Sequence, residues 1–224
     1  MMERDTIFDE FSNNTALWCG ADLDAGELAR ATELVVSRNI PMMSVPEDDI
    51  VVVWPWLENK GVEIVSRFYF ADKDIADGQI SDVTMQINKA FKHGAKGAQV
   101  FLPYAALEDL VNQTHVIRDD LFFNRDLSIG IDLMEIDSYD WQNLFQNLQK
   151  INASSVVLVL TKDIGKKSDF VGRIYGLLNA WDDNNKFDLH FALGPNFMRI
   201  EQVVRLIESM KPDLLQGTKF WVNF

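Results

Sequence analysis

The chain has 224 residues, and its 47% hydrophobic content suffices for one domain with a large core. A net charge of −13 and a sequence pI near 4.6 exclude a nucleic-acid partner, since phosphates demand a basic face. The single cysteine, Cys19, excludes a disulfide framework and a cysteine metal cluster, and it fits a reducing compartment.

The amino-terminal residues 1–5 lack the basic and apolar regions of a signal peptide, and no apolar run approaches the roughly 18 residues of a membrane span. We therefore expect a cytoplasmic protein with no membrane partner. A leading helix over Thr6–Phe11, within residues 1–14, is expected to cover one end of the fold.

From Ala16 onward a short apolar run and a stretch of helical periodicity alternate about eight times. Parallel strands each need a crossover helix, so this alternation predicts an α/β fold, a (β/α)8 TIM barrel formed by residues 15–219 of a single domain. Asp24 and Glu27 form a capping box for the first helix. The expected strands are Ala16–Cys19, Met42–Val45, Val62–Phe70, Ala98–Leu102, Leu127–Leu133, Ser155–Leu160, Leu189–Leu193 and Leu214–Gly217.

The residues after the last expected strand are too few for an eighth helix. They form an aromatic tail, residues 220–224, that includes Phe220, Trp221 and Phe224. An exposed aromatic patch usually marks an interface, so the tail predicts a homodimer through this patch. The alternative is that these rings tuck under the leading helix.

Active sites of TIM barrels lie where the strands end, and polar residues gather at the expected strand ends. They are Asp22, Asp24, Ser44, Arg67, Tyr69, Gln99, Tyr104, Asp132, Glu135, Thr161, Lys162, Asn196, Thr218 and Lys219. Gly194 and Gly217 follow the last two strands, where bare backbone amides suit a phosphate, aided by Thr218 and Lys219. The alternative is that the two glycines only make tight turns.

Two further candidates each have a structural alternative. Asp132 and Glu135 suit general acid or base chemistry, but helix-capping carboxylates look the same in sequence. Lys162 is the lysine best placed to line a pocket, and it shares strand parity with Leu158 and Leu160, although a solvated loop lysine would look alike. The three histidines show no metal-ligand spacing, and we assign no metal site and no cofactor.

One segment, Gly94–Leu107 with the sequence GAKGAQVFLPYAAL, resembles the deoxyribose-phosphate aldolases, class I lyases of the same barrel fold. The likeness runs from about Met42 to Thr218. It includes Ser44–Pro46 with the helix to Gly61, Val62–Phe70, Ile129–Asp132, Phe191–Pro195 and Leu215–Thr218. The resemblance implies a Schiff-base lysine on strand six, a second lysine on strand seven, an aspartate on strand four and glycine-rich phosphate loops.

The chain departs from that pattern at each of these positions. The strand-six interval Val156–Leu160 has no lysine, and Phe191 stands where the second lysine is expected. Gln99 replaces the strand-four aspartate and cannot exchange a proton near neutral pH. Gly194-Pro195 replaces a glycine pair, and Thr218-Lys219 replaces serines.

Three functions follow as hypotheses. The first is an aldolase-like lyase acting on a small phosphorylated aldehyde or keto compound. Its residues would be Lys162 as a relocated amine, Asp132 as acid/base and Gln99 at the strand-four position. The substrate and its phosphate would be bound by Gly194, Gly217, Thr218, Lys219 and Asp22. The second is a degenerate, non-catalytic or ligand-binding relative. The third is a carboxylate- and magnesium-dependent barrel enzyme that uses Asp22, Asp132 and Glu135.

Overall fold

The computed structural model describes residues 11–70, 80–112, 125–160, 167–194 and 197–224, and its core is a closed barrel of eight parallel strands in chain order. The predicted (β/α)8 barrel is therefore confirmed. The strands are β1 (Thr15–Trp18), β2 (Met42–Pro46), β3 (Glu63–Tyr69), β4 (Gly97–Phe101), β5 (Asp126–Asp132), β6 (Ser155–Val159), β7 (Asp188–Ala192) and β8 (Lys219–Asn223).

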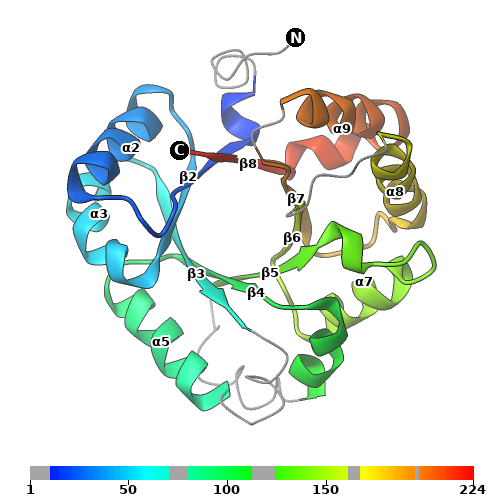
Figure 1. The fold of residues 1–224 in the computed structure, drawn as a ribbon, viewed down its shortest axis with the longest axis horizontal. Helices are drawn as coiled ribbons and strands as arrows, with labels where there is room; N and C mark the ends of the chain where they lie inside the picture. Colours follow the sequence, from blue (N-terminus) through cyan, green and yellow to red (C-terminus); the bar gives the residue numbers. More distant parts are fainter. Residues whose placement is uncertain (1–10, 71–79, 113–124, 161–166, 195–196) are drawn as a thin grey trace.

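The α-helices form a ring outside the strands (Figure 1). They are α2 (Ala25–Ser37), α3 (Ile50–Leu57), α5 (Ile80–Lys92), α7 (Trp141–Lys150), α8 (Lys167–Ala180) and α9 (Phe197–Met210). Short 3-10 helices lie at η1 (Ser12–Asn14), η2 (Glu47–Asp49), η3 (Tyr104–Ala106), η4 (Leu133–Glu135) and η5 (Pro212–Gln216). None of the helices within the described ranges is long and apolar enough to cross a membrane.

The predicted capping box is present at the start of α2. The Asp24 carboxylate accepts the Glu27 backbone N–H at 2.8 Å, and the Glu27 carboxylate accepts the Asp24 backbone N–H at 3.1 Å. The box satisfies two of the backbone donors that a helix start leaves without intrahelical partners. It thereby fixes where the chain turns from the end of β1 into α2.

The core has two parts because successive strand side chains point to opposite faces. The larger cluster combines strand and helix residues, so it fills the space between sheet and helices, and it includes Leu158 and Phe191. The smaller cluster consists of strand residues alone and lies inside the barrel; its buried members are Ala16, Val65, Phe101, Val157, Ala192 and Trp221. The parity assumed for strand six was therefore wrong for the interior, since Val157 and not Leu158 points inward.

The last strand lies later in the chain than expected. The segment Leu214–Gly217 is not a strand, because Pro212 opens the short 3-10 helix η5 there. β8 instead pairs with β1 through Thr15↔Phe220 and Ala16↔Trp221, and with β7 through Phe191↔Phe220, which closes the barrel. No helix follows it within the described ranges, as predicted.

The aromatic tail is therefore a barrel strand and not an exposed patch. Phe220 is 0% exposed and Trp221 1% exposed. The predicted dimer interface assumed an exposed aromatic patch. That premise is wrong for Phe220 and Trp221, because both rings lie in the core. The leading helix over Thr6–Phe11 falls almost wholly on residues 1–10, outside the described residues.

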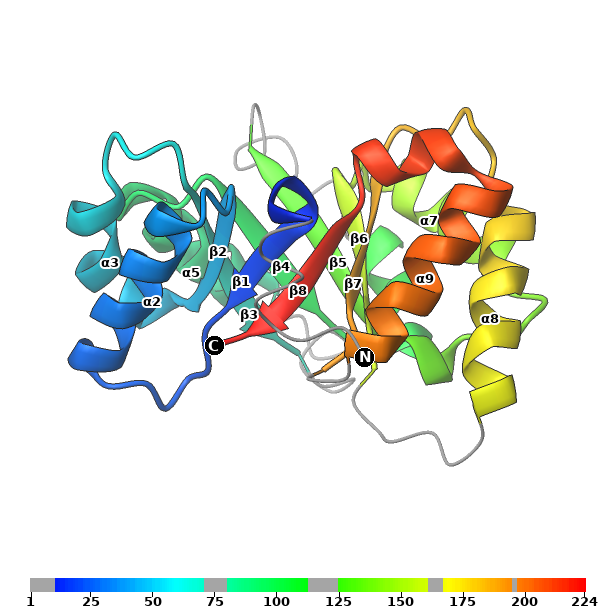
Figure 2. The ribbon, with the colours of Figure 1, turned by 90° about the horizontal axis from the view of Figure 1, so that it is seen from above.

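The segment before β1 contacts the end of the barrel at which the strands begin, here called the floor (Figure 2). The Asn14 side-chain amide donates to the backbone carbonyls of Leu215 at 2.6 Å and Thr218 at 2.9 Å. The Lys219 amine donates to the Asn13 carbonyl at 2.6 Å. These bonds hold η1 against the start of β8.

Candidate functional site

A pocket of about 400 Å³ opens where the strands end. This mouth pocket lies on the side of the barrel where enzymes of this fold carry their chemistry, and its volume is typical of small-molecule sites. It is lined by Trp18, Tyr69, Phe70, Phe101, Leu102, Pro103, Gly130, Asp132, Glu135 and Val159.

Three aromatic rings form one wall of the mouth pocket. Tyr69 and Phe101 are stacked with centroids 5.0 Å apart, and Trp18 lies tilted against Phe101 at 5.2 Å. They come from the ends of β3, β4 and β1. Tyr69 is 64% exposed, so its ring is available to a ligand. Such a wall suits an apolar or flat part of a small molecule.

Two carboxylates face the same pocket, and both also hold the backbone. Asp132, at the end of β5, accepts the Met134 backbone N–H at 2.8 Å and so caps η4. Glu135 accepts the Tyr104 backbone N–H at 2.8 Å, which ties the turn after β4 to the turn after β5. The structure thus supports the capping interpretation of Asp132, and it also places Asp132 in the lining of the mouth pocket.

A buried arginine lies in the barrel interior beside this aromatic wall. Arg67 of β3 is 6% exposed, donates to the Cys19 backbone carbonyl, and carries its guanidinium 4.8 Å from the centre of the Trp18 ring. Burial lowers the pKa of Arg67 and raises that of the neighbouring Cys19 thiol to about 12. Cys19 is thus an inert thiol near pH 7, whereas Arg67 supplies positive charge inside the barrel.

The predicted site residues do not form one site. Gln99 is fully buried in β4, Asp22 is exposed in the turn after β1, and Gly194 follows β7 with a φ of +70°. Lys162 lies outside the described residues, in the connection between β6 and α8. Gly217, Thr218 and Lys219 come before or at the start of β8, so they lie at the floor, at the opposite end of the barrel from Gly194.

The floor residues have structural partners of their own. The Thr218 hydroxyl donates to the Leu214 carbonyl at 2.8 Å and is fully buried. The space beside Gly217 is taken by the Asp188 carboxylate, since a Cβ at Gly217 would lie 2.3 Å from Asp188 Oδ1. Gly194 and Gly217 therefore lie at opposite ends of the barrel, because strand eight begins at Lys219, five residues later than the expected Leu214.

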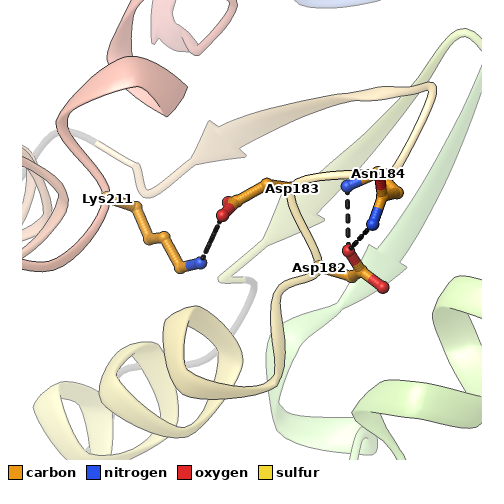
Figure 3. Close-up of polar contacts among 4 residues, drawn as sticks. All are labelled: Asp182, Asp183, Asn184 and Lys211. Atoms are coloured by element: carbon orange, nitrogen blue, oxygen red, sulfur yellow. Dashed lines mark hydrogen bonds and ion pairs between the residues drawn. The ribbon is translucent and has the colours of Figure 1, made fainter.

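A second pocket, of about 540 Å³, lies at the floor between the turns before β7 and β8. Its charges are mostly acidic, with Asp183, Asp188 and Asp213 in its lining. Lys211 there forms an ion pair with Asp183 at 2.9 Å (Figure 3). The neighbouring Asp182 accepts hydrogen bonds from the Asn184 backbone and side chain, which lower the pKa of Asp182. An acidic lining of this kind disfavours a phosphate.

No group of three or more metal-ligating side chains comes together within the described ranges. His190, on β7, points into the barrel and is buried, and burial lowers its pKa to about 3, aided by the positive charge of Lys219. His190 is therefore neutral near pH 7. Its place in the interior makes it a core histidine and not a surface ligand.

The comparisons with known proteins match this geometry. No family model matches the chain, and no curated protein is similar to it in sequence. Among solved structures, the deoxyribose phosphate aldolase from Aeropyrum pernix superposes with a TM-score of 0.69 at 10% identity, covering 96% of this chain and 87% of its own. The fold is that of the deoxyribose-phosphate aldolases.

Two further structures show the same barrel. A putative deoxyribose-phosphate aldolase from Coccidioides immitis has a TM-score of 0.70 at 10% identity, with 96% of this chain and 82% of its own covered. A putative copper homeostasis protein CutC from Streptococcus agalactiae has a TM-score of 0.62 at 11% identity, with coverages of 93% and 97%. The aldolase resemblance is confirmed as one of fold, and identities this low carry no function.

Sequence reasoning placed Arg67 and Tyr69 at the end of strand three but gave them no role, and it missed Trp18 and Phe101. The available signal was the arginine itself, a charged residue inside a run of buried strand residues. Burying such a charge is costly unless ion pairs or hydrogen bonds compensate it, which makes a buried arginine a candidate for binding a ligand.

Proposed function

We propose that the protein is a ligand-binding barrel with the aldolase fold that takes a small metabolite into the mouth pocket without imine chemistry. The observation that supports this most directly is the lining of the interior on β6 and β7, where the inward residues near the strand ends are Val157, Val159 and Ala192. Within the described ranges no lysine lines the mouth pocket. A Schiff base requires an amine at the reacting carbon.

The chemistry of the pocket limits the ligand. The aromatic wall favours an apolar or planar part, and the Asp132 and Glu135 carboxylates favour hydroxyl or amine donors at the rim. A hydroxylated carbon skeleton of a few atoms meets both conditions within about 400 Å³.

A melting screen with hydroxylated and phosphorylated metabolites tests this. Tyr69→Ala removes an exposed ring of the pocket wall, and Tyr139→Ala is the matched control at a residue that is 96% exposed and does not line the pocket. A ligand of the mouth pocket raises the melting temperature of the wild type and of Tyr139→Ala, and raises that of Tyr69→Ala much less. Ligands that act equally on all three proteins contradict the proposal.

The aldolase-like lyase is the second candidate. It is favoured by one observation: Val159, the last residue of β6, lines the mouth pocket, and the connection that carries Lys162 follows directly in the chain. Borohydride trapping with acetaldehyde and with deoxyribose 5-phosphate, followed by peptide mapping, separates the two candidates. An adduct on Lys162 that disappears in Lys162→Met supports the lyase and contradicts the non-catalytic proposal.

The carboxylate and magnesium alternative has less support. Asp132 and Glu135 share the mouth pocket, but Asp22 is exposed and does not line it. Two carboxylates that already accept backbone hydrogen bonds are a weak basis for a cation site. We do not propose this function.

We also propose that the protein self-associates, since the aldolase from Aeropyrum pernix is described as tetrameric. The surface involved is not formed by Phe220 and Trp221, which are buried. Light scattering on the purified protein gives the molecular mass directly, and the mass of a monomer at all concentrations contradicts the proposal. The cytoplasmic location stays a prediction.

A further inference from the structure

We propose that the barrel interior beside the mouth pocket binds an oxyanion, a carboxylate or phosphate group, between Arg67 and Gln99. The inference deepens the proposed function and rests on it in one respect, because the oxyanion is taken to be the acidic group of the ligand in the mouth pocket. It assigns the ligand's chemical class: a small hydroxylated acid or phosphate ester.

The first step is the cost of burying Arg67. A guanidinium removed from water loses several kcal/mol of solvation unless charges or hydrogen bonds replace the water. Arg67 is 6% exposed; it donates to one backbone carbonyl and lies over one aromatic ring. Burial lowers the pKa of Arg67, whereas the negative charge of the Asp49 carboxylate raises it and so offsets part of the cost of burial. The Arg67 Nε and Nη1 atoms are buried without an acceptor.

The second step is the side chain next to it. Gln99 is the direct register partner of Arg67 across β3 and β4, so both side chains leave the same face of the sheet toward the interior. Gln99 is 0% exposed, and its Oε1 accepts a hydrogen bond from the Ser44 hydroxyl at 2.7 Å. This bond orients the amide and leaves Nε2 buried as a donor without an acceptor.

The third step is the chemistry of the set. Two guanidinium nitrogens and one amide nitrogen are all donors, and the guanidinium carries a positive charge. Donors alone cannot satisfy one another, and a cation would be repelled. An oxyanion supplies acceptors and charge together, and a guanidinium binds carboxylate or phosphate in a two-pronged geometry.

The fourth step links this place to the mouth pocket. Trp18 lines the pocket, and the Arg67 guanidinium lies 4.8 Å from the centre of the Trp18 ring. Trp18 therefore contacts both the pocket and the charge. A ligand whose carbon skeleton rests on the aromatic wall has its acidic group directed past Trp18 toward Arg67.

The test uses inorganic phosphate and acetate as probes, with chloride at matched ionic strength as the reference. The melting temperature of the wild type is expected to rise with phosphate or acetate and to saturate. Arg67→Met is expected to abolish the rise, and Gln99→Leu to weaken the apparent affinity about tenfold through loss of one hydrogen bond to a charged group. Arg30→Met is the control, since the Arg30 side chain is 69% exposed on α2.

Several outcomes overturn the inference. One is a wild type whose melting temperature does not respond to either anion. Another is a rise in melting temperature with anion that is as large in Arg67→Met and Gln99→Leu as in the wild type, because the anion then binds at a site elsewhere on the protein. Should Arg67→Met not fold, Arg67→Lys keeps the charge but not the two-pronged geometry, and unchanged affinity in Arg67→Lys and Gln99→Leu together overturns the inference.

The same measurements keep this inference apart from the proposed function. Tyr69→Ala is expected to lose the organic ligand while keeping the response to inorganic phosphate. An organic ligand that binds at the mouth and is indifferent to Arg67→Met contradicts the oxyanion site alone. If the protein responds to phosphate but Tyr69→Ala weakens the binding of no organic ligand, the result contradicts the proposed mouth-pocket function and leaves the oxyanion site standing.

Discussion

Phe101 of β4 packs against Gly130, its register partner on β5, so closely that a Cβ at Gly130 would lie 2.0 Å from Phe101 Cδ1. The backbone of β5 therefore forms part of the pocket wall, and the Phe101 ring fills the place that a side chain would take. This contact holds the ring in position for its stacking with Tyr69 at 5.0 Å.

Gly130→Ala is expected to destabilise the protein by about 1–3 kcal/mol, because the added methyl group displaces the Phe101 ring from a packed interior. Gly172→Ala is the matched control, since nothing lies within 4 Å of a Cβ placed there in α8, and it is expected to be neutral or to stabilise by up to about 1 kcal/mol. Urea unfolding measures both. Equal free energies of unfolding for the two variants contradict the packing described.

Phe220→Ala is expected to cost about 3–5 kcal/mol of folding free energy, because Phe220 is fully buried and stacks on Phe191 with centroids 5.9 Å apart. An exposed interface ring would instead change self-association and leave the unfolding of the monomer nearly untouched. Tyr139→Ala, at an exposed aromatic residue, is the control and is expected to stay within about 0.5 kcal/mol of the wild type. Unfolding curves at several protein concentrations distinguish the two cases.

The sequence predicted the barrel well because the strand and helix periodicities are local properties. The capping box at Asp24 and the first seven strands needed only neighbouring residues to be recognised. β8 was missed because two local signals compete near the carboxyl terminus. Leu214 and Leu215 look like a short apolar strand and are predicted to form strand eight. The β-forming run Phe220–Val222 follows them, so the prediction places it in a tail after the barrel.

The site could be predicted only in part, for a different physical reason. Which strand residues face the interior depends on closure of the barrel, and a shift of one residue exchanges the two faces. The sequence comparison sets Phe191 against the second aldolase lysine. In the structure Phe191 lies on the outer face of β7, whereas its neighbours His190 and Ala192 face inward. The donor set of Arg67 and Gln99 arises from pairing between two strands, which single-strand patterns do not show.

Two substitutions at Asp132 distinguish a capping role of this residue from a chemical one. Asp132→Asn keeps the Oδ1 acceptor for the Met134 N–H but removes the charge, and it is expected to leave stability within about 0.5 kcal/mol of the wild type. Asp132→Ala removes the cap and is expected to cost about 1 kcal/mol. The free energies of unfolding of the two variants check this. If an activity is found and Asp132→Asn abolishes it with stability unchanged, the carboxylate acts in chemistry as well as in capping.

His190 makes stability depend on pH in a direction that follows from its burial. Its pKa is about 3 in the folded protein and about 6.5 when exposed, so between these values the unfolded chain binds the proton and the folded protein does not. The free energy of unfolding therefore falls as the pH falls from about 6.5 toward 3, by at most about 1.4 kcal/mol per pH unit from this residue.

His190→Gln cannot take up the proton and is expected to show a shallower loss of stability over the same window. The difference between the two proteins is the quantity to measure, by urea unfolding at half-unit steps from pH 7 to pH 4. The contribution of other groups, including Asp188, whose pKa burial raises, is common to both and cancels. Parallel curves for wild type and variant would show that His190 is protonated, or reachable by water, inside the folded barrel.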